Sequence, residues 1–268
     1  MKKLLLILLS SIFLGSCGVN PYRKTDKMYK KQLASLQKQI AKKDTSNIDN
    51  GLTSKFIGTT NFNLRKPNFV VIHHTAQDSV QQTIRTFTLV RTQVSAHYVI
   101  ADDGKIIQML NDYLRAWHGG SGTWGKNSDI NSTSIGIELD NNGTEPFSDA
   151  QIKSLLSLLT KLKKTYNIPA QNFIGHSDIA PTRKNDPSRL FPWKLLSENG
   201  FGLWQNYENT VAPITFDPVM GLQLIGYNTK DINATIKAFK LHYNQVEVDV
   251  VLDQKTIDLI YNIYKQQQ

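Results

Sequence analysis

The stretch Asn68–Ala76, which reads NFVVIHHTA, decides the fold of this chain. Its run Phe69–Ile72 is apolar and largely β-branched, which is typical of a strand buried in the centre of a sheet. Two histidines follow, and their side chains point to opposite faces because successive residues of a strand alternate. His73 shares its face with Val71, so at most one of the two histidines can easily reach a given metal ion.

Helix and strand signals alternate on the C-terminal side of this stretch. Two capping boxes, at residues 79–82 and 148–151, predict helices that end near residues 91 and 167. Strands that alternate with long helices predict an α/β domain with a mixed β-sheet flanked by helices, which we place at residues 59–200. The other strands of this sheet are expected over residues 96–100, 105–110, 134–139 and 172–175.

A connector over residues 201–215 precedes a small helical unit at residues 216–268. Apolar residues at helical spacing predict three helices there, over Val219–Ile225, Asp231–Tyr243 and Gln254–Tyr264. About fifty residues fold alone only marginally, so we expect this unit to dock on the preceding domain. His242, in the middle helix, is expected on the surface.

The N-terminus has the features of an export signal. Two lysines precede the apolar run Leu4–Leu14, which is shorter than the roughly 20 residues that a membrane-spanning helix needs. The sequence Leu14-Gly15-Ser16-Cys17 resembles the lipobox of bacterial lipoproteins, so residues 1–16 are expected to be a signal peptide and Cys17 to carry lipid. Cys17 is the only cysteine, which excludes a disulfide within the chain.

Residues 17–58 are expected to form a basic tether, with a short helix over Met28–Lys43. The formal charge of +9 is concentrated here, because residues 18–45 contain eight basic and two acidic residues, whereas residues 46–268 contain 21 basic and 20 acidic ones. A nucleic-acid-binding protein needs its basic patch on the folded body, so no nucleic-acid partner is expected. The charge suits an anionic lipid or wall polymer instead.

Gly18 directly follows the cysteine that is expected to carry lipid, and a glycine there favours the outer membrane, facing the periplasm. The chain is expected to be a monomer.

Three segments carry residue types that bind zinc in hydrolytic enzymes: VIHHTA (71–76), IGIELD (135–140) and GHSDIAPTRKNDP (175–187). Such sites take three protein ligands and leave a fourth position for water. In the last segment, Asp178 and Asp186 follow His176, and spacing alone does not choose between the two carboxylates. Prolines stiffen the loop before Asp186, which suits a ligand.

Further residues suit the chemistry of hydrolysis. On strand alternation Glu138 shares a face with Gly136, either as a solvent-facing residue or as a carboxylate able to take a proton from water. Lys184 either neutralises an oxyanion or is a solvated loop charge. His97 and His118 are expected in core or groove-lining positions, not as metal ligands.

Six strings between Val71 and Trp193 are together highly specific: VIHHTA, SAHYVI, AWHGG, TSIGIELDN, GHSDIAPTRKNDP and LFPW. They resemble the zinc-dependent N-acetylmuramoyl-L-alanine amidases related to phage lysozyme-type amidases and peptidoglycan recognition proteins, in particular the outer-membrane lipoprotein type. The resemblance implies a mixed sheet with flanking helices and a shallow groove that holds one Zn2+ per chain. It implies that the zinc ligands are His73, His176 and Asp186.

The resemblance also implies roles for the remaining candidates. Glu138 would be the catalytic acid and base, and Lys184 the cation that stabilises the oxyanion. His97, Trp117 and His118 would lie along the substrate groove. The implied reaction is hydrolysis of the amide between N-acetylmuramic acid and L-alanine in peptidoglycan, in cell-wall turnover or recycling. The alternative is a recognition protein on the same fold, which binds wall fragments without cutting them.

The helical unit resembles the peptidoglycan-binding three-helix module through the strings GLQLIGYNT, ATIKAFKLHY and LDQKTIDLI. Lys240 stands where that module has Gln, and the usual Asp-Gly before the last helix is absent. Glycan binding and a purely structural role therefore both stay open for residues 216–268.

Overall fold

The computed structural model describes residues 20–41, 47–48, 52–53, 57, 59–206 and 210–268. The chain divides between Phe62 and Asn63 into two units. The first unit contains α1 (Arg23–Ala41) and the antiparallel pair β1 (Asn47–Ile48) and β2 (Leu52–Thr53). The predicted signal peptide and Cys17 lie outside the described residues.

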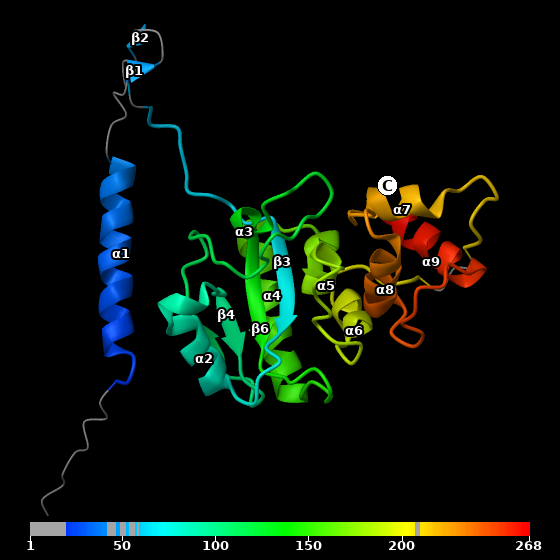
Figure 1. Ribbon diagram of the computed structural model, residues 1–268, viewed down its shortest axis with the longest axis horizontal. Coiled ribbons are helices and arrows are strands. Elements are labelled where there is room, and N and C mark those ends of the chain that lie inside the picture. Colours follow the sequence, from blue (N-terminus) through cyan, green and yellow to red (C-terminus); the bar gives the residue numbers. More distant parts are fainter. Residues whose placement is uncertain (1–19, 42–46, 49–51, 54–56, 58, 207–209) are drawn as a thin grey trace, which may run out of the picture. The chain divides into compact units, whose positions relative to one another are not determined.

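Helix α1 begins five residues before the helix that the sequence predicts (Figure 1). The side chain of Asn20 accepts a hydrogen bond from the backbone N–H of Tyr22 at 2.9 Å, which makes a turn just ahead of the helix. No residue of α1 is buried, and Ile40 is 79% exposed. Among the described residues, no helix is both long and apolar enough to cross a membrane.

The second unit, Asn63–Gln268, is built on a five-stranded sheet in the order β5-β4-β6-β3-β7. Strands β4, β6, β3 and β7 are parallel, and β5 runs antiparallel to β4. The predicted mixed sheet is therefore confirmed, and the apolar run of β3 is buried between two neighbours. The strands are β3 (Phe69–His74), β4 (Tyr98–Ile100), β5 (Ile106–Gln108), β6 (Ser134–Leu139) and β7 (Phe173–Gly175).

One face of the sheet packs against α4 (Asp149–Tyr166), and α2 (Val80–Thr88) lies beside β4, followed by η2 (Val90–Thr92). Alternate residues of the central strands, such as Ile72 and Ile137, form a core there with the leucines of α4. Ser148 caps α4 as predicted, but the Gln151 side chain does not return to it. It donates instead to the carbonyls of Ile100 and Asp140, at 2.9 and 3.1 Å, which ties the start of the helix to the ends of β4 and β6.

The other face is covered by short helices and by the C-terminal helices. A second core joins Val71 and Ile174 of the sheet to Phe239 and Ile260 of the C-terminal helices. The expected docking is therefore observed, since both predicted domains share one core and belong to one compact unit. The remaining helices are α3 (Ile130–Thr133), η3 (Ala170–Asn172), α5 (His176–Ile179), α6 (Trp193–Glu198), α7 (Pro218–Ile225), α8 (Ile232–Tyr243) and α9 (Gln254–Lys265). Of these, α6 contributes Trp193 and Leu196 to the core on the α4 face.

The surface position predicted for His242 is wrong. Its side chain is 1% exposed, because α8 packs beside α5 (Figure 1). Nδ1 of His242 lies 2.7 Å from the carboxylate of Asp178, and its ring stacks on Trp193 with the ring centres 3.8 Å apart. His242 borders the apolar stripe of α8 that includes Phe239, so helical periodicity alone did not decide its environment.

Candidate metal centre

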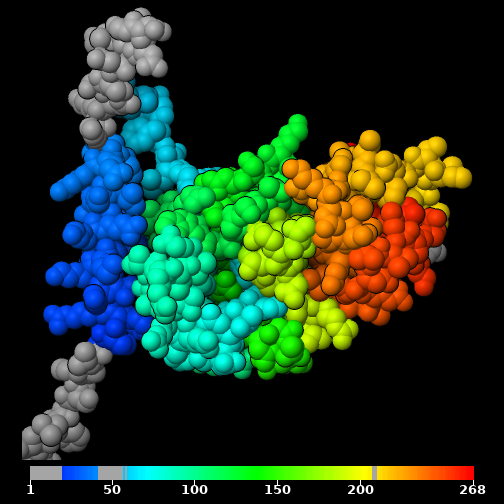
Figure 2. All heavy atoms as spheres, in the orientation of Figure 1, coloured from blue at the N-terminus to red at the C-terminus, as the bar shows by residue number. Residues whose placement is uncertain are grey.

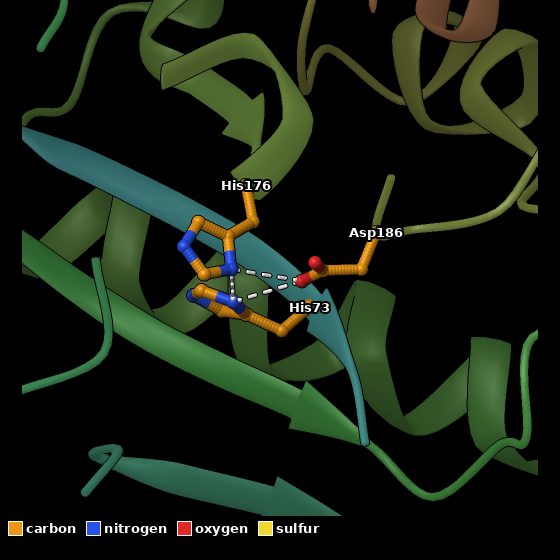
Figure 3. A group of neighbouring side chains, drawn as sticks. All are labelled: His73, His176 and Asp186. Atoms are coloured by element: carbon orange, nitrogen blue, oxygen red, sulfur yellow. Dashed lines mark hydrogen bonds and ion pairs between the residues drawn. The ribbon is translucent and has the colours of Figure 1, made fainter. Parts of the chain in front are cut away.

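Three predicted ligands converge at the end of the central strand. His73 lies in β3, His176 is the first residue of α5, and Asp186 lies in the loop after α5. Their side chains point toward one another (Figure 3). The two histidine Nδ1 atoms are 2.9 Å apart, and Oδ2 of Asp186 lies 3.1 and 3.0 Å from them. All three are buried, and within the described part of the chain they form the group that could hold a metal ion.

This donor set fits zinc. Two imidazoles and a carboxylate are ligands that zinc takes, and bonds of about 2.0–2.2 Å in a tetrahedron place neighbouring ligand atoms about 3.3–3.6 Å apart. The observed separations are slightly shorter, so a small outward movement would admit the ion.

The protonation of the group also suits a cation. Burial, followed by the nearby His176, lowers the pKa of His73 to about 4, so its ring is neutral at neutral pH. Burial alone would raise the pKa of Asp186, but the imidazoles of His176 and His73 beside its carboxylate hold it well below its usual range. Zinc ligands must be neutral imidazole and ionised carboxylate, which are the forms that these shifts favour.

Hydrogen bonds behind His73 select the nitrogen that it offers. The hydroxyl of Ser134 donates to the carbonyl of Ile130 at 2.6 Å, so it accepts from Nε2–H of His118 at 3.0 Å. Nδ1 of His118 then has no proton and accepts from Nε2–H of His73 at 3.1 Å. This arrangement, assigned from the hydrogen-bond partners, leaves the lone pair of His73 Nδ1 facing His176 and Asp186.

The hydrogen bonds that run from Ser134 through His118 to His73 form a relay, and strand β6 leaves space for it on one face. Ser134, Gly136 and Glu138 face the site, while the residues between them face the core against α4. A Cβ added at Gly136 would lie 2.4 Å from the ring of His118, so the ring can pack on the strand only where a glycine stands. The side chain of Asn131 accepts from the backbone N–H of His118 at 3.1 Å and from that of the next residue, which fixes the loop.

Glu138 and Lys184 lie close to this group. Glu138 is paired in register with His73 on the neighbouring strand, so both side chains lie on the same face of the sheet. Burial and then the negative charge of Asp186 raise the pKa of Glu138 to about 8, against the opposing charge of Lys184. Lys184 is exposed in the loop that leads to Asp186, and its charge also lowers the pKa of His73.

Two other ligand candidates lie apart from the group. His74 faces the other side of β3, where its Nδ1 accepts from the backbone N–H of Ser188 at 3.1 Å. Asp178 is fully buried, and its carboxylate accepts from the hydroxyl of Tyr227 and the backbone N–H of Gly175. The structure thus places Asp186, and not Asp178, beside the two histidines.

The three residues expected along the groove differ in exposure. Trp117 is 45% exposed, whereas His118 is 7% and His97 0% exposed. Nε2–H of His97 donates to the carbonyl of Leu114, and its Nδ1 accepts from the backbone N–H of Gly136, both at 3.0 Å. His97 and His118 therefore occupy buried positions, and Trp117 is the exposed one of the three. The surface of this unit is hollowed between the teal α2 segment and the yellow-green segment around α5 (Figure 2).

Comparison with known proteins decides the family. The Amidase_2 family, described as N-acetylmuramoyl-L-alanine amidase, matches residues 63–189. N-acetylmuramoyl-L-alanine amidase AmiD of Escherichia coli (strain K12) is 34% identical over 219 residues, which cover 70% of this chain and 78% of that protein. The chain belongs to the N-acetylmuramoyl-L-alanine amidase family. The predicted family resemblance is thereby confirmed.

Other relatives of this amidase differ in how far the likeness extends. 1,6-anhydro-N-acetylmuramyl-L-alanine amidase AmpD of the same strain is 42% identical over 101 residues, which cover 38% of this chain and 55% of that protein. The solved structure of AmiD from E. coli, in complex with anhydro-N-acetylmuramic acid-L-Ala-D-γ-Glu-L-Lys, matches with a TM-score of 0.69 and 29% identity over 82% of this chain and 97% of that one. AmpDh3 from Pseudomonas aeruginosa matches with a TM-score of 0.70 and 26% identity over 82% of this chain and 98% of that one.

Sequence reasoning about this amidase missed Ser134, Gly136 and Tyr227. A glycine inside a β-branched strand marks a close approach of another group, so Gly136 carried a usable signal. Ser134 and Tyr227 carried none, because their partners are 16 and 49 residues away in the chain.

Proposed function

We propose that this amidase hydrolyses the bond between the lactyl group of N-acetylmuramic acid and L-alanine in peptidoglycan with one zinc ion per chain. The observation that carries this proposal is the convergence of two histidine imidazoles and a carboxylate within about 3 Å of one another. The ligands in this proposal are His73, His176 and Asp186. When bound, zinc supplies Lewis-acid chemistry that polarises a carbonyl and makes water a nucleophile near neutral pH.

Glu138 and Lys184 perform the remaining steps of the proposed mechanism. Glu138 takes a proton from the attacking water and returns it to the nitrogen of L-alanine as the amide breaks. Burial raises the pKa of Glu138 in the metal-free chain, and the positive charge of a bound metal ion would lower that pKa toward the range in which the carboxylate can first take a proton. The ammonium group of Lys184 stabilises the negative charge that develops on the carbonyl oxygen.

A recognition protein on the same fold needs neither a complete ligand set nor a proton carrier. The chain keeps three ligands together with Glu138 and Lys184 around them, which favours hydrolysis over binding alone. The solved relatives AmiD and AmpDh3 were each obtained with an anhydromuramic peptide, which supports muropeptides as substrates of this chain.

The proposed location is the bacterial envelope, with the lipidated Cys17 in the outer membrane and the folded unit in the periplasm. The support is the basic, apolar and small-residue order of residues 2–17. The substrate lies outside the cytoplasm, which agrees with export.

Digestion of purified sacculi and of soluble muropeptides tests the proposed reaction. We expect zinc-dependent release of stem peptides that begin with L-alanine, and one zinc per chain by metal analysis. His176→Ala and Asp186→Ala should lose both the zinc and the activity. An Asp186→Ala protein that retains zinc would overturn the ligand assignment, and intact sacculi after treatment with zinc-loaded protein would overturn the reaction.

Glu138→Gln separates catalysis from metal binding. The substitution is nearly isosteric but cannot accept a proton, so zinc content should stay at one per chain while turnover falls by roughly two orders of magnitude or more. Near-normal turnover would mean that another group moves the proton.

A further inference from the structure

We propose that the C-terminal helices are part of the metal centre, because Tyr227 and His242 position the turn that carries one ligand, His176, and binds the backbone of another, Asp186. The inference rests on the proposed zinc site. It gives residues 216–268 a role in this amidase that does not depend on glycan binding.

The contact between the two parts of the unit is the carboxylate of Asp178. It is fully buried and accepts three hydrogen bonds: Oδ1 from the hydroxyl of Tyr227 at 2.5 Å, and Oδ2 from the backbone N–H of Gly175 and from Nδ1–H of His242, both at 2.7 Å. A buried carboxylate is stable only when such donors replace water. Burial and then the charge of Asp178 raise the pKa of Tyr227 well above its ordinary value, so its hydroxyl keeps the proton that it donates.

The same carboxylate holds the turn on which the ligands depend. Its bond to the N–H of Gly175 fixes the passage from β7 into α5, and His176 is the first residue of α5. The backbone N–H of Ser177 then donates to the carbonyl of Asp186 at 2.8 Å. His176 and Asp186 are therefore both attached to one turn of four helical residues, which is too short to keep its shape without outside contacts.

The end of α8 also contacts the chain beyond Asp186. The side-chain amide of Gln245 donates to the carbonyls of Arg189 and Phe191, at 3.0 and 2.6 Å. The ring of His242 is stacked between Trp193 of α6 and its own neighbour Tyr243, with ring centres 3.8 and 4.0 Å away. The C-terminal helices thus contact the ligand-bearing segment on both sides, at Asp178 before Asp186 and at residues 189–191 after it.

Variants of His242 and Tyr227 in the full chain separate positioning from mere support of the fold. Tyr227→Phe removes one of the three donors to Asp178, and His242→Phe removes a second while keeping a stacked ring; the N–H of Gly175 stays in both variants. His242→Asn loses the ring but keeps an N–H near the place of Nδ1. Ile260→Val is the matched control, because it removes a buried methyl group from the same core without approaching Asp178.

The readouts are the dissociation constant for Zn2+ alone and the visible absorption of bound Co2+, which reports coordination geometry. We expect Tyr227→Phe and His242→Phe to weaken zinc binding roughly tenfold or more and to alter the cobalt spectrum. His242→Asn should restore zinc affinity toward that of the unaltered chain, and Ile260→Val should lower the melting temperature with zinc affinity unchanged.

The outcomes distinguish this inference from the proposal on which it rests. If the unaltered chain binds one zinc and both phenylalanine variants bind it equally well, the positioning role is wrong although the zinc site stands. If the unaltered chain binds no zinc, the proposed function fails, and the inference fails with it.

Discussion

At the scale of residues, the site depends on the side chain of Ser134, which is bonded to His118 and Ile130 rather than to a ligand. The hydroxyl of Ser134 donates its proton to the carbonyl of Ile130, so toward His118 it can only accept a hydrogen bond. His118 must therefore carry its proton on Nε2 and accept at Nδ1, which requires the proton of His73 to be on Nε2. A tautomer fixed in this way before the metal arrives removes one cost of binding.

Ser134→Ala should therefore weaken zinc binding roughly tenfold or more. The substitution leaves a buried N–H of His118 without a partner, which favours the other tautomer and puts a proton on Nδ1 of His73. Zinc titration of the full chain measures the effect, with Ser132→Ala as the control because its hydroxyl is bound to the exposed Asp129. Equal zinc affinity in the Ser134→Ala and Ser132→Ala proteins would contradict the relay.

Part of this residue-level picture follows from the sequence. Strand alternation placed Glu138 and Gly136 on one face, and the structure puts that face beside His73. The choice between Asp178 and Asp186 did not follow from spacing, because it depends on how the loop returns and on donors from a distant helix. His242 was misplaced for the same reason.

At the scale of elements, His97 extends the ladder between β4 and β6. Its backbone N–H donates to the carbonyl of Gly136, and its ring Nδ1 accepts from the N–H of the same residue, both at 3.0 Å. The side chain thus takes the place of a strand carbonyl just before β4 begins. Burial lowers the pKa of His97 to about 4, against the opposing effect of the Leu114 carbonyl.

The stability of the metal-free protein should fall as the pH falls from about 6.5 to about 4. Between these pH values the unfolded chain binds a proton at His97 and the folded chain does not, so the free energy of unfolding decreases as the pH falls. Below about pH 4 both states are protonated at His97, and this group causes no further decrease. The shift corresponds to roughly 3 kcal/mol. Denaturant unfolding at several pH values measures it, and His97→Gln should reduce the pH slope by about one proton. An unchanged slope would show that His97 is not the titrating group.

The elements themselves were largely predictable. The three C-terminal helices differ from their predicted bounds by one residue at single ends, because Asp caps and apolar periodicity mark them clearly. The caps at Ser79 and Ser148 were also found. The start of α1 was missed because the helix begins in a polar stretch ahead of its first apolar residue.

At the scale of the whole molecule, sequence reasoning expected two domains that dock, and the second of the two cores contains residues of both. Periodicity identifies an apolar face but not the surface that covers it, so docking was expected while the contacts at Asp178 were not. The exposed basic helix α1 belongs to a separate unit, and its charge agrees with the proposed attachment to an envelope membrane.

Cys17→Ser should release the protein from the membrane without loss of chemistry. The cysteine is proposed to carry the lipid, and the folded unit begins 46 residues later at Asn63. Fractionation should move the variant from the membrane to the soluble fraction or leave it unprocessed, while activity on soluble muropeptides stays at the level of the unaltered chain. A variant that remains with membranes as the unaltered chain does would mean that lipid is not the anchor.

Arg65 gives this architecture a mechanical property. It is the third residue of the folded unit, and its guanidinium group donates to the carbonyls of Tyr113, Ser132 and Asp112 at 3.0, 2.7 and 2.9 Å and to that of Leu114. If lipid holds one end of the chain and the wall holds the substrate, tension enters the unit at this residue. The load is then shared among four hydrogen bonds before it reaches β3, so the strand that carries His73 is protected from being peeled out of the sheet.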